Sequence, residues 1–331
     1  MKKKIVFLLN ETLTARLFAQ QDLVKLEMLG EVVRNPISKG PSTEQVRSLI
    51  CDADAVITGW ECPALGKELL DLAPNLQIVA HAAGSVKYVV TEELFSKGIR
   101  VTTSSEPLGI GVAETALGLT IASLKNMWFL SEDTRRGGWE FDNKAVRELY
   151  GITVGVVGAG KAGRHYIRLI RNFDVDILLS DPTLTKDEAR ELGVTLVELD
   201  ELLERADVVS IHAPSLPETH HMFNKRNLPL MKDGAILINT ARGALIDEDA
   251  LIAELRVGRI FAALDVTDPE PPALDHPFRS LPNVILLPHI AGATNNGLKR
   301  IGTHVATELE RFFTGKTLKT EIKREELDCL A

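Results

Sequence analysis

The stretch from Gly155 to Asp181 constrains the fold of this chain more than any other. The apolar run Ile152–Val157 has the composition of a buried parallel strand, and it ends in Gly-Ala-Gly-Lys-Ala-Gly, residues 158–163. A helical segment follows, and a second strand, Val175–Leu179, leads to Asp181. We therefore expect a strand–turn–helix–strand unit built around a G-x-G-x-x-G turn.

Each glycine of this turn has a separate physical task. Gly158 permits the tight change of direction, Gly160 lets a pyrophosphate approach the backbone, and Gly163 lets the helix pack closely on the strand. The helix N-terminus adds N–H groups and the positive end of its dipole. In this context the motif predicts a dinucleotide site, against the alternative of an ordinary glycine-rich turn.

Asp181 stands where an acid accepts hydrogen bonds from the ribose hydroxyls of a bound dinucleotide. A carboxylate at this position repels the 2′-phosphate of NADP. The neighbouring residues Ser180 and Pro182 supply no arginine to offset that repulsion. We therefore expect NAD rather than NADP.

Composition narrows the class of protein. The 331 residues suffice for two domains, and 45% hydrophobic with 25% charged residues is typical of a globular protein. A net charge of −8 argues against nucleic-acid binding. The apolar run Ile5–Leu9 is too short for a signal sequence or membrane span, and we expect no other segment to cross a bilayer. The three cysteines have no metal or redox spacing, which favours a cytoplasmic protein without a metal site.

Strand-like and helix-like segments alternate along the first hundred residues, and Thr14–Leu29 has the pattern of one amphipathic helix. This alternation predicts a doubly wound parallel sheet that lacks a phosphate-binding turn. The stretch Pro107–Gly111 interrupts the pattern, and Val112–Ala122 is predicted to be a long buried helix that enters a second domain. The charged tail Lys316–Ala331 is expected to be peripheral.

These patterns together predict an α/β protein with two doubly wound parallel-sheet domains. Residues 1–108 and 293–331 form a flavodoxin-like substrate domain. Residues 109–292 form a Rossmann nucleotide-binding domain inserted into it.

Four predicted strand ends in the second domain carry residues suited to chemistry: His212–Pro214, Asn239–Gly243, Asp265–Glu270 and Pro288–Gly292. Ligands of open α/β sheets bind beyond such ends. An arginine can hold a substrate carboxylate with two hydrogen bonds, a histidine can exchange a proton near neutral pH, and an acid can orient that histidine. Taken singly, each of these residues has an ordinary structural explanation.

The sequence resembles the D-isomer-specific 2-hydroxyacid dehydrogenase family along nearly its whole length. The densest matches are residues 155–160, 212–214, 239–247, 264–266 with 270–271, and 288–292. The resemblance implies an NAD-dependent oxidoreductase acting on a small D-2-hydroxy or 2-oxo acid. It implies Arg242 as the binder of the substrate carboxylate and carbonyl, Glu270 as the partner of the histidine, and His289 as acid/base.

The resemblance also implies a set of coenzyme contacts. Asp265 would bind the nicotinamide carboxamide, and Lys161 and Ala162 would give backbone N–H groups to the pyrophosphate. The remaining implied contacts are Gly158, Gly160, Gly163, Asp181, His212, Pro214, Thr219, Thr240, Ala241, His289 and Gly292. The family further implies a homodimer through the Val112 helix.

The predicted substrate loop departs from the family pattern Arg-Ala-Gly-x-Gly-x-Asp-Asn, because residues 81–88 read His-Ala-Ala-Gly-Ser-Val-Lys-Tyr. The N–H groups of Gly84, Ser85 and Val86 can still hold a carboxylate. His81 and Lys87 replace the usual arginine and aspartate, so the substrate is not carried over, and His81 becomes a candidate substrate contact. Trp60 either reaches the pocket or is a partly buried surface aromatic.

A different class of function stays open at this point. The family also contains corepressors that keep the dehydrogenase scaffold, so an NAD(H)-sensing binding protein is the alternative to an enzyme. The chain has no long low-complexity tail for docking, which favours the enzyme.

Overall fold

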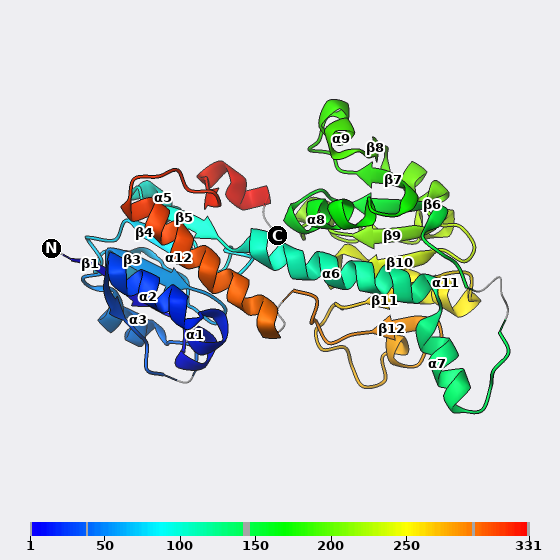
Figure 1. Cartoon of the computed structure of the whole chain (residues 1–331), viewed down its shortest axis with the longest axis horizontal. Coiled ribbons are helices and arrows are strands. Elements are labelled where there is room, and N and C mark those ends of the chain that lie inside the picture. The colour runs from blue at the N-terminus through cyan, green and yellow to red at the C-terminus, as the bar shows by residue number, and fades with distance from the viewer. Residues whose placement is uncertain (1, 38, 142–145, 293–294, 330–331) are drawn as a thin grey trace. The chain divides into compact units, whose positions relative to one another are not determined.

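The computed structural model describes residues 2–37, 39–141, 146–292 and 295–329, and its backbone divides into two compact units. Unit 1 comprises Met1–Leu108 and Ala293–Ala331, and unit 2 comprises Gly109–Gly292 (Figure 1). Each unit is built around its own sheet, and the two are described separately.

Unit 1 holds a sheet of six strands in the order β13-β5-β4-β3-β1-β2. The order of the five N-terminal strands is that of flavodoxin-like sheets. All strand pairs are parallel except β13 with β5. The strands are β1 (Lys3–Phe7), β2 (Gly30–Val33), β3 (Ala55–Thr58), β4 (Ile78–His81), β5 (Arg100–Thr103) and β13 (Glu321–Ile322). The helices are α1 (Glu11–Leu17), α2 (Gln20–Leu29), α3 (Thr43–Ile50), α4 (Lys67–Leu70), α5 (Glu92–Ser96) and α12 (Lys299–Phe313).

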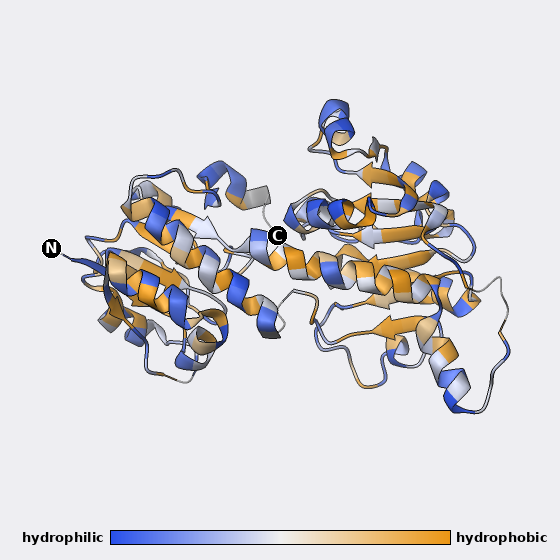
Figure 2. Cartoon of the chain, in the orientation of Figure 1, coloured by the Kyte–Doolittle hydropathy of each residue, from blue (hydrophilic) through white to orange (hydrophobic). Residues whose placement is uncertain are grey.

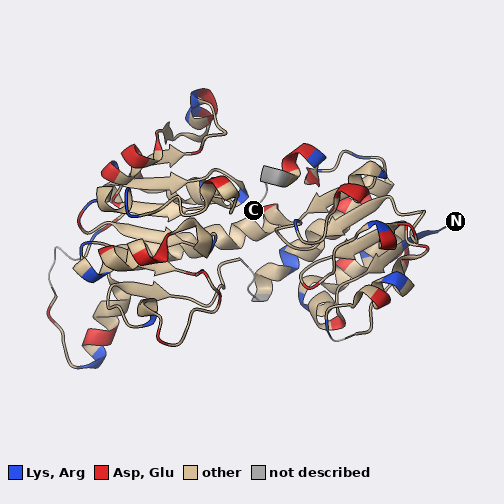
Figure 3. Cartoon of the chain, turned by 180° about the vertical axis from the view of Figure 1, so that it is seen from behind, with Lys and Arg blue, Asp and Glu red and all other residues tan. Residues whose placement is uncertain are grey.

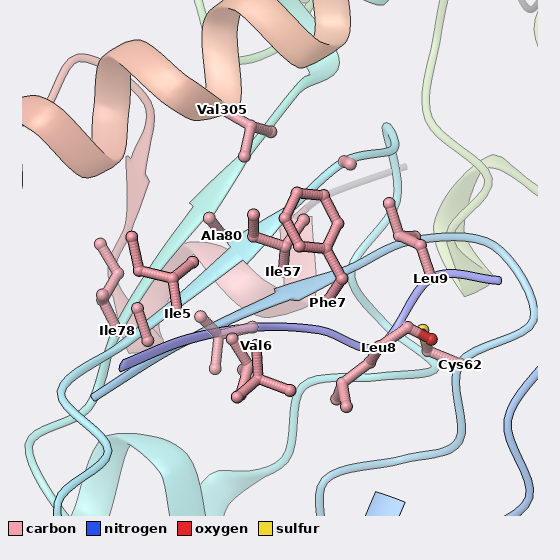
Figure 4. Close-up of a cluster of buried hydrophobic side chains, with 14 of the residues drawn as sticks. Ile5, Val6, Phe7, Leu8, Leu9, Ile57, Cys62, Ile78, Ala80 and Val305 are labelled. Carbon is pink, nitrogen blue, oxygen red and sulfur yellow. The ribbon is translucent and has the colours of Figure 1, made fainter. Parts of the chain in front are cut away.

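The core of unit 1 forms because its central strands are apolar on both faces, as strands covered on both sides must be. Phe7 of β1, Ile57 of β3 and Ala80 of β4 are fully buried, and Val305 of α12 packs against the same cluster (Figure 4). The segment that carries the predicted substrate loop therefore starts from a rigid strand.

The helix expected over Thr14–Leu29 is two helices, so that expectation was wrong. Phe18 is extended at the end of α1, and its ring packs edge-on against Phe7 with 5.0 Å between centroids. The Asp22 carboxylate then accepts a hydrogen bond from Ala19 N at 2.9 Å and starts α2. Burial of one aromatic side chain and a local cap thus outweigh the continuous helical pattern.

The charged C-terminal tail is not wholly peripheral, contrary to expectation. β13 adds an antiparallel edge strand to β5. Glu308 of α12 is buried, and its Oε2 accepts hydrogen bonds from the backbone N–H groups of Lys319 at 2.8 Å and Thr320 at 3.0 Å. This buried carboxylate fixes the start of the tail.

Unit 2 holds a parallel sheet of seven strands in the order β12-β11-β10-β9-β6-β7-β8, the doubly wound order of dinucleotide-binding domains. The predicted α/β class with two such domains is therefore confirmed. The strands are β6 (Tyr150–Val157), β7 (Asp174–Ser180), β8 (Thr195–Leu196), β9 (Val208–Ile211), β10 (Ile236–Asn239), β11 (Phe261–Leu264) and β12 (Val284–Leu286). The helices are α7 (Met127–Arg135), α8 (Lys161–Ile170), α9 (Lys186–Leu192), α10 (Leu199–Arg205) and α11 (Glu248–Val257).

The order of the unit 2 strands reverses between β6 and β9, and ligands bind in the crevice that such a switch creates. In Figure 2 the strands are predominantly hydrophobic, whereas Figure 3 shows the charged residues mainly on helices and loops. The candidate site residues at the strand ends are thus polar residues that follow apolar strands.

Helix α6 (Ser105–Leu124) runs through the segment where we expected a break at Pro107–Gly111. Pro107 lies in the first helical turn, where its missing N–H leaves no helical bond unmade, so the helix tolerates it. By length and composition α6 would suffice to span a membrane, which also corrects the expectation that no segment would. Its buried residues, among them Ala113 and Leu119, pack in the core of unit 2.

Candidate functional site

The glycine turn after β6 is tightly packed at two of its glycines and open at the third. Gly158 has φ +93°, and a Cβ there would lie 2.7 Å from Ala213 N. A Cβ on Gly163 would lie 2.1 Å from the Gly158 carbonyl oxygen, so α8 packs on the turn as only glycine allows. A Cβ on Gly160 would meet nothing within 4 Å. The turn is therefore tight where it must be and open in the middle.

The open side of the turn exposes the start of α8. Gly160 is the N-cap residue and has no side chain to cap the helix. Among the described residues, the N–H groups of Ala162 and Gly163 have no acceptor, and the first hydrogen bond of the helix runs from Arg164 N to Gly160 O at 3.0 Å. Unpaired N–H groups at the positive end of a helix dipole bind phosphate.

Asp181 follows β7 and ties this strand end to the glycine turn. Its Oδ2 accepts from Ala159 N at 2.7 Å, and its Oδ1 accepts from Thr183 N at 2.8 Å and Thr183 Oγ1 at 2.6 Å. Oδ2 keeps capacity for a further donor. Arg164 Nε donates to the Ala159 carbonyl at 2.8 Å, so Asp181 and Arg164 both bind the backbone of Ala159, at its N–H and its carbonyl respectively.

His212 follows β9 and lies beneath the glycine turn. Burial lowers the pKa of its imidazole to about 3, so the ring is neutral at physiological pH. Its Nε2 lies 2.9 Å from Ser210 Oγ, and Tyr166 OH lies 2.7 Å from Thr120 Oγ1, whose hydroxyl donates to the Ala116 carbonyl at 2.8 Å. His212 is therefore a buried neighbour of the turn, with its Cβ 3.3 Å from the position of a Cβ on Gly163.

Two other predicted coenzyme contacts differ in their hydrogen bonding. The Thr219 hydroxyl donates to the Pro214 carbonyl at 2.7 Å and accepts from Leu216 N at 2.9 Å, which closes the loop after His212. The Thr240 hydroxyl is buried without a partner among the described residues. Thr240 thus retains hydrogen-bonding capacity at the end of β10.

Arg242 is positioned by Asn239, which lies in the predicted strand end but had been given no role of its own. The Asn239 side chain accepts from Ala241 N at 3.0 Å and donates to the Arg242 carbonyl at 2.9 Å. The Arg242 guanidinium donates to the Ala241 carbonyl at 2.7 Å and has no carboxylate within 4.0 Å among the described residues. Its positive charge is therefore available to an anionic ligand.

Asp265 organises the turn that carries His289. Its carboxylate accepts from Ile290 N and Ala291 N, each at 2.8 Å. Burial raises the pKa of Asp265 above its ordinary value of 3.8, and those two backbone bonds oppose the rise. His289 itself has φ +52°, a conformation that this clamp holds.

His289 and Glu270 form a hydrogen-bonded pair, with 2.7 Å between Nδ1 and Oε2, and their side chains are 50% and 38% exposed. Because Nδ1 faces Glu270, Nε2 is the ring nitrogen left for a substrate. A cavity of about 420 Å³ lies beside the pair, lined by Asp265, Thr267, Glu270, Pro271, Pro272, Arg279, Leu286, Leu287, Pro288 and His289. The structure thus brings Asp265, Glu270 and His289 together, whereas Arg242 is not among the lining residues.

A second acid and histidine, missed by sequence reasoning, support the Glu270 loop. Glu248 of α11 accepts from Asp268 N at 3.0 Å and lies 3.2 Å from His276 Nε2. Burial raises the pKa of Glu248 above its ordinary value. Only the loop after Glu270 brings His276 back to α11, so no local pattern could have found this pair.

In unit 1, the structure buries His81 completely, which corrects the expectation that its side chain contacts substrate directly. Its Nδ1 hydrogen-bonds with Thr58 Oγ1 at 2.9 Å, and burial lowers the pKa of the ring to about 4. The Ser85 backbone lies close, although Nε2 makes no bond of hydrogen-bond geometry. His81 is therefore a support for the loop above it.

The predicted substrate loop is held by its carbonyl groups, which leaves its N–H groups unused. Thr103 Oγ1 donates to the Gly84 carbonyl at 2.6 Å. The N–H groups of Gly84, Ser85 and Val86 have no acceptor among the described residues. Lys87 is exposed, and Trp60 is partly buried against the unit 1 core. Successive backbone N–H groups without an acceptor are the kind of donor that can bind a carboxylate.

Comparison with known proteins gives concordant results. A family model described as "D-isomer specific 2-hydroxyacid dehydrogenase, NAD binding domain" matches residues 117–291. The chain is 35% identical over 299 residues to a D-3-phosphoglycerate dehydrogenase from Methanocaldococcus jannaschii, covering 89% of this chain and 56% of the relative. It is 35% identical over 300 residues to a glyoxylate reductase from Thermococcus onnurineus, covering 88% of each chain.

Among solved structures, a phosphoglycerate oxidoreductase from Rhizobium etli is similar with a TM-score of 0.82. It is 25% identical in sequence, and the match covers 98% of this chain and 99% of that one. The chain spans about half the length of the phosphoglycerate dehydrogenases that it matches, at 56% and 54%, but most of the glyoxylate reductase.

Proposed function

The chain belongs to the D-isomer-specific 2-hydroxyacid dehydrogenase family, and we propose that it transfers a hydride between NAD(H) and a small D-2-hydroxy or 2-oxo acid. The observation that carries this proposal is the His289–Glu270 pair, 2.7 Å apart, at the strand ends of a unit that also holds the glycine turn. Acid/base and coenzyme functions thus belong to one compact unit.

The proton chemistry follows from the orientation of His289. Glu270 binds Nδ1 and so directs Nε2 outward, where it can donate a proton to the carbonyl oxygen of a 2-oxo acid during reduction. The same nitrogen accepts the hydroxyl proton in the reverse reaction. Glu270 stabilises the imidazolium form that receives this proton. The Asp265 clamp on the two residues after His289 keeps the ring in place.

The substrate anion needs fixed positive groups. We assign its carboxylate and carbonyl to Arg242, whose guanidinium has no carboxylate partner within 4.0 Å among the described residues. A planar guanidinium binds a carboxylate through two parallel hydrogen bonds and polarises an adjacent carbonyl. The unused N–H groups of Gly84, Ser85 and Val86 are the proposed carboxylate donors of unit 1.

The residues around the glycine turn fit a dinucleotide. The space over Gly160 and the unpaired N–H groups of Ala162 and Gly163 suit a pyrophosphate, and the remaining capacity of Asp181 suits a ribose hydroxyl. The nicotinamide, when bound, supplies or accepts the hydride. NAD is the proposed coenzyme because the Asp181 carboxylate repels a 2′-phosphate.

A homodimer through α6 is part of this proposal. The helix is predominantly apolar, yet only 33% of its most apolar 18-residue stretch is buried. Met127 and Trp128, at the start of α7, are 50% and 39% exposed. Apolar surface of this kind commonly marks a subunit contact. Molar mass in solution tests it.

Turnover is the decisive test of the function. The protein is incubated with NADH and a panel of 2-oxo acids that includes glyoxylate, pyruvate and hydroxypyruvate, and loss of NADH absorbance is followed. We expect oxidation of NADH with at least one acid, and a rate at least about a hundredfold lower with the His289→Asn variant. NADH binding without turnover across the panel would instead indicate the NAD(H)-sensing alternative.

A further inference from the structure

Helix α6 contains three glycines, at positions 109, 111 and 118, although glycine is among the least favourable residues inside a helix. None of the three has a positive φ, so the backbone conformation does not require them. The reason for a glycine at each position must therefore lie in the atoms that surround it.

The three positions differ sharply in the space around them. Gly118 is exposed, and a Cβ there would meet nothing within 4 Å. A Cβ on Gly111 would lie 3.4 Å from the Ala291 carbonyl oxygen, an ordinary contact. A Cβ on Gly109 would lie 3.0 Å from Ala162 N and 3.2 Å from Ala162 Cα. Only Gly109 touches backbone more closely than a side chain normally permits.

The atom that Gly109 contacts belongs to the proposed coenzyme site. Ala162 is the second residue of α8, and its N–H has no acceptor among the described residues. A side chain on Gly109 would have to push this first turn of α8 by a few tenths of an ångström, because a backbone atom cannot rotate out of the way. Hydrogen bonds to phosphate depend on donor positions at that scale.

We propose that Gly109 is a positioning residue for the coenzyme. By lacking a side chain it lets α6 pack directly on the first turn of α8, and this contact sets where the α8 N–H groups meet the pyrophosphate. The inference rests on the proposed coenzyme function of α8. It predicts that replacing Gly109 weakens the binding of ligands that contain a pyrophosphate and leaves the binding of ligands without one nearly unchanged.

The test compares Gly109→Ala with the matched variant Gly118→Ala, in the same helix, by titrating each with NADH, ADP-ribose and adenosine. Gly109→Ala should raise the Kd of NADH and ADP-ribose about tenfold, the effect of weakening charge-assisted hydrogen bonds, and change the Kd of adenosine by less than about twofold. Gly118→Ala should leave all three Kd values unchanged and raise the melting temperature by about 2 °C.

Each other outcome has a defined meaning. Equal losses for adenosine and ADP-ribose would show a general structural effect and overturn the inference, as would an unchanged Kd for both pyrophosphate ligands. If the wild type binds neither NADH nor ADP-ribose, the proposed function itself fails, and the inference with it. Gly109→Ala is also measured together with Gly118→Ala, whose added stability keeps the double variant folded.

Discussion

Replacing Gly158 and Gly160 separately distinguishes the folding role of the glycine turn from its proposed coenzyme role. Gly158→Ala places a side chain at φ +93° and 2.7 Å from Ala213 N. The positive φ costs roughly 1–2 kcal/mol, and the forced contact costs about 1–3 kcal/mol. The free energy of unfolding should therefore fall by about 2–5 kcal/mol, which lowers the melting temperature by about 5–15 °C for a protein of this size.

Gly160→Ala should behave in the opposite way. The added Cβ meets nothing within 4 Å, and φ is −67°, so the cost to the fold is limited to a poorer N-cap, at most about 1 kcal/mol. The methyl group projects where the pyrophosphate would approach, so the Kd of NADH should rise at least about tenfold, equivalent to about 1.4 kcal/mol.

Thermal unfolding and NADH fluorescence titration on the same samples measure both effects. The matched control is Gly234→Ala, which has a positive φ of +76° but nothing within 4 Å of the added Cβ. The Gly234→Ala variant therefore measures the free-energy cost of the positive φ without the cost of a close contact. A Gly160→Ala variant that binds NADH as the wild type does would refute the assignment of the open side of the turn to the pyrophosphate.

Three other measurements test the site and its supporting histidines. His289→Asn should lower kcat by at least about a hundredfold with little change in the Kd of NADH, because a general acid acts only in the chemical step; an unchanged kcat would mean that another group supplies the proton. Wild type should turn over NADH faster than NADPH at equal low concentration, and Asp181→Ala should narrow the difference; equal rates in wild type would contradict the repulsion argument. Burial lowers the pKa values of His212 and His81 to about 3 and about 4 in the folded protein, below the ordinary 6.5. Between these values and 6.5 the unfolded chain binds more protons than the folded protein, so the free energy of unfolding should fall as the pH drops from 6.5 towards 4. Melting temperatures measured across that pH range test this, and the His212→Asn and His81→Asn variants should show a weaker dependence on pH.

Patterns within a short stretch of sequence predicted much of the fold. The apolar strands and the G-x-G-x-x-G turn are local features, because the strand, the turn and the helix that define them follow one another directly along the chain. The α/β alternation and the position of the turn predicted two doubly wound sheets, and both observed strand orders are of that kind. The pairing of Glu270 with His289 came from the family resemblance, and the structure places the two atoms 2.7 Å apart.

What could not be predicted was the difference between a loop residue and a buried one. His81 occupies the substrate-loop position, yet its ring lies under the loop because Thr58, on the neighbouring strand, supplies a buried partner. The bonds of Asp181 and Arg164 to the backbone N–H and carbonyl of Ala159 were likewise not predicted, because Asp181 reaches the turn only where β7 lies beside β6. Both cases depend on which strands and turns become adjacent.

The glycines of α6 are a further case in which the sequence alone could not predict the role of a residue. From the sequence, glycines at 109 and 111 after Pro107 indicated a break between domains, because glycine and proline usually end helices. The structure continues the helix, since the proline stands in its first turn and the Gly109 contact with Ala162 needs the absence of a side chain rather than a flexible backbone. A glycine needed for close approach and one needed for a turn are identical in sequence. Only the atoms nearest to an added Cβ separate the two explanations. At Gly109 the nearest is the backbone nitrogen of Ala162 at 3.0 Å, whereas at Gly118 nothing lies within 4 Å.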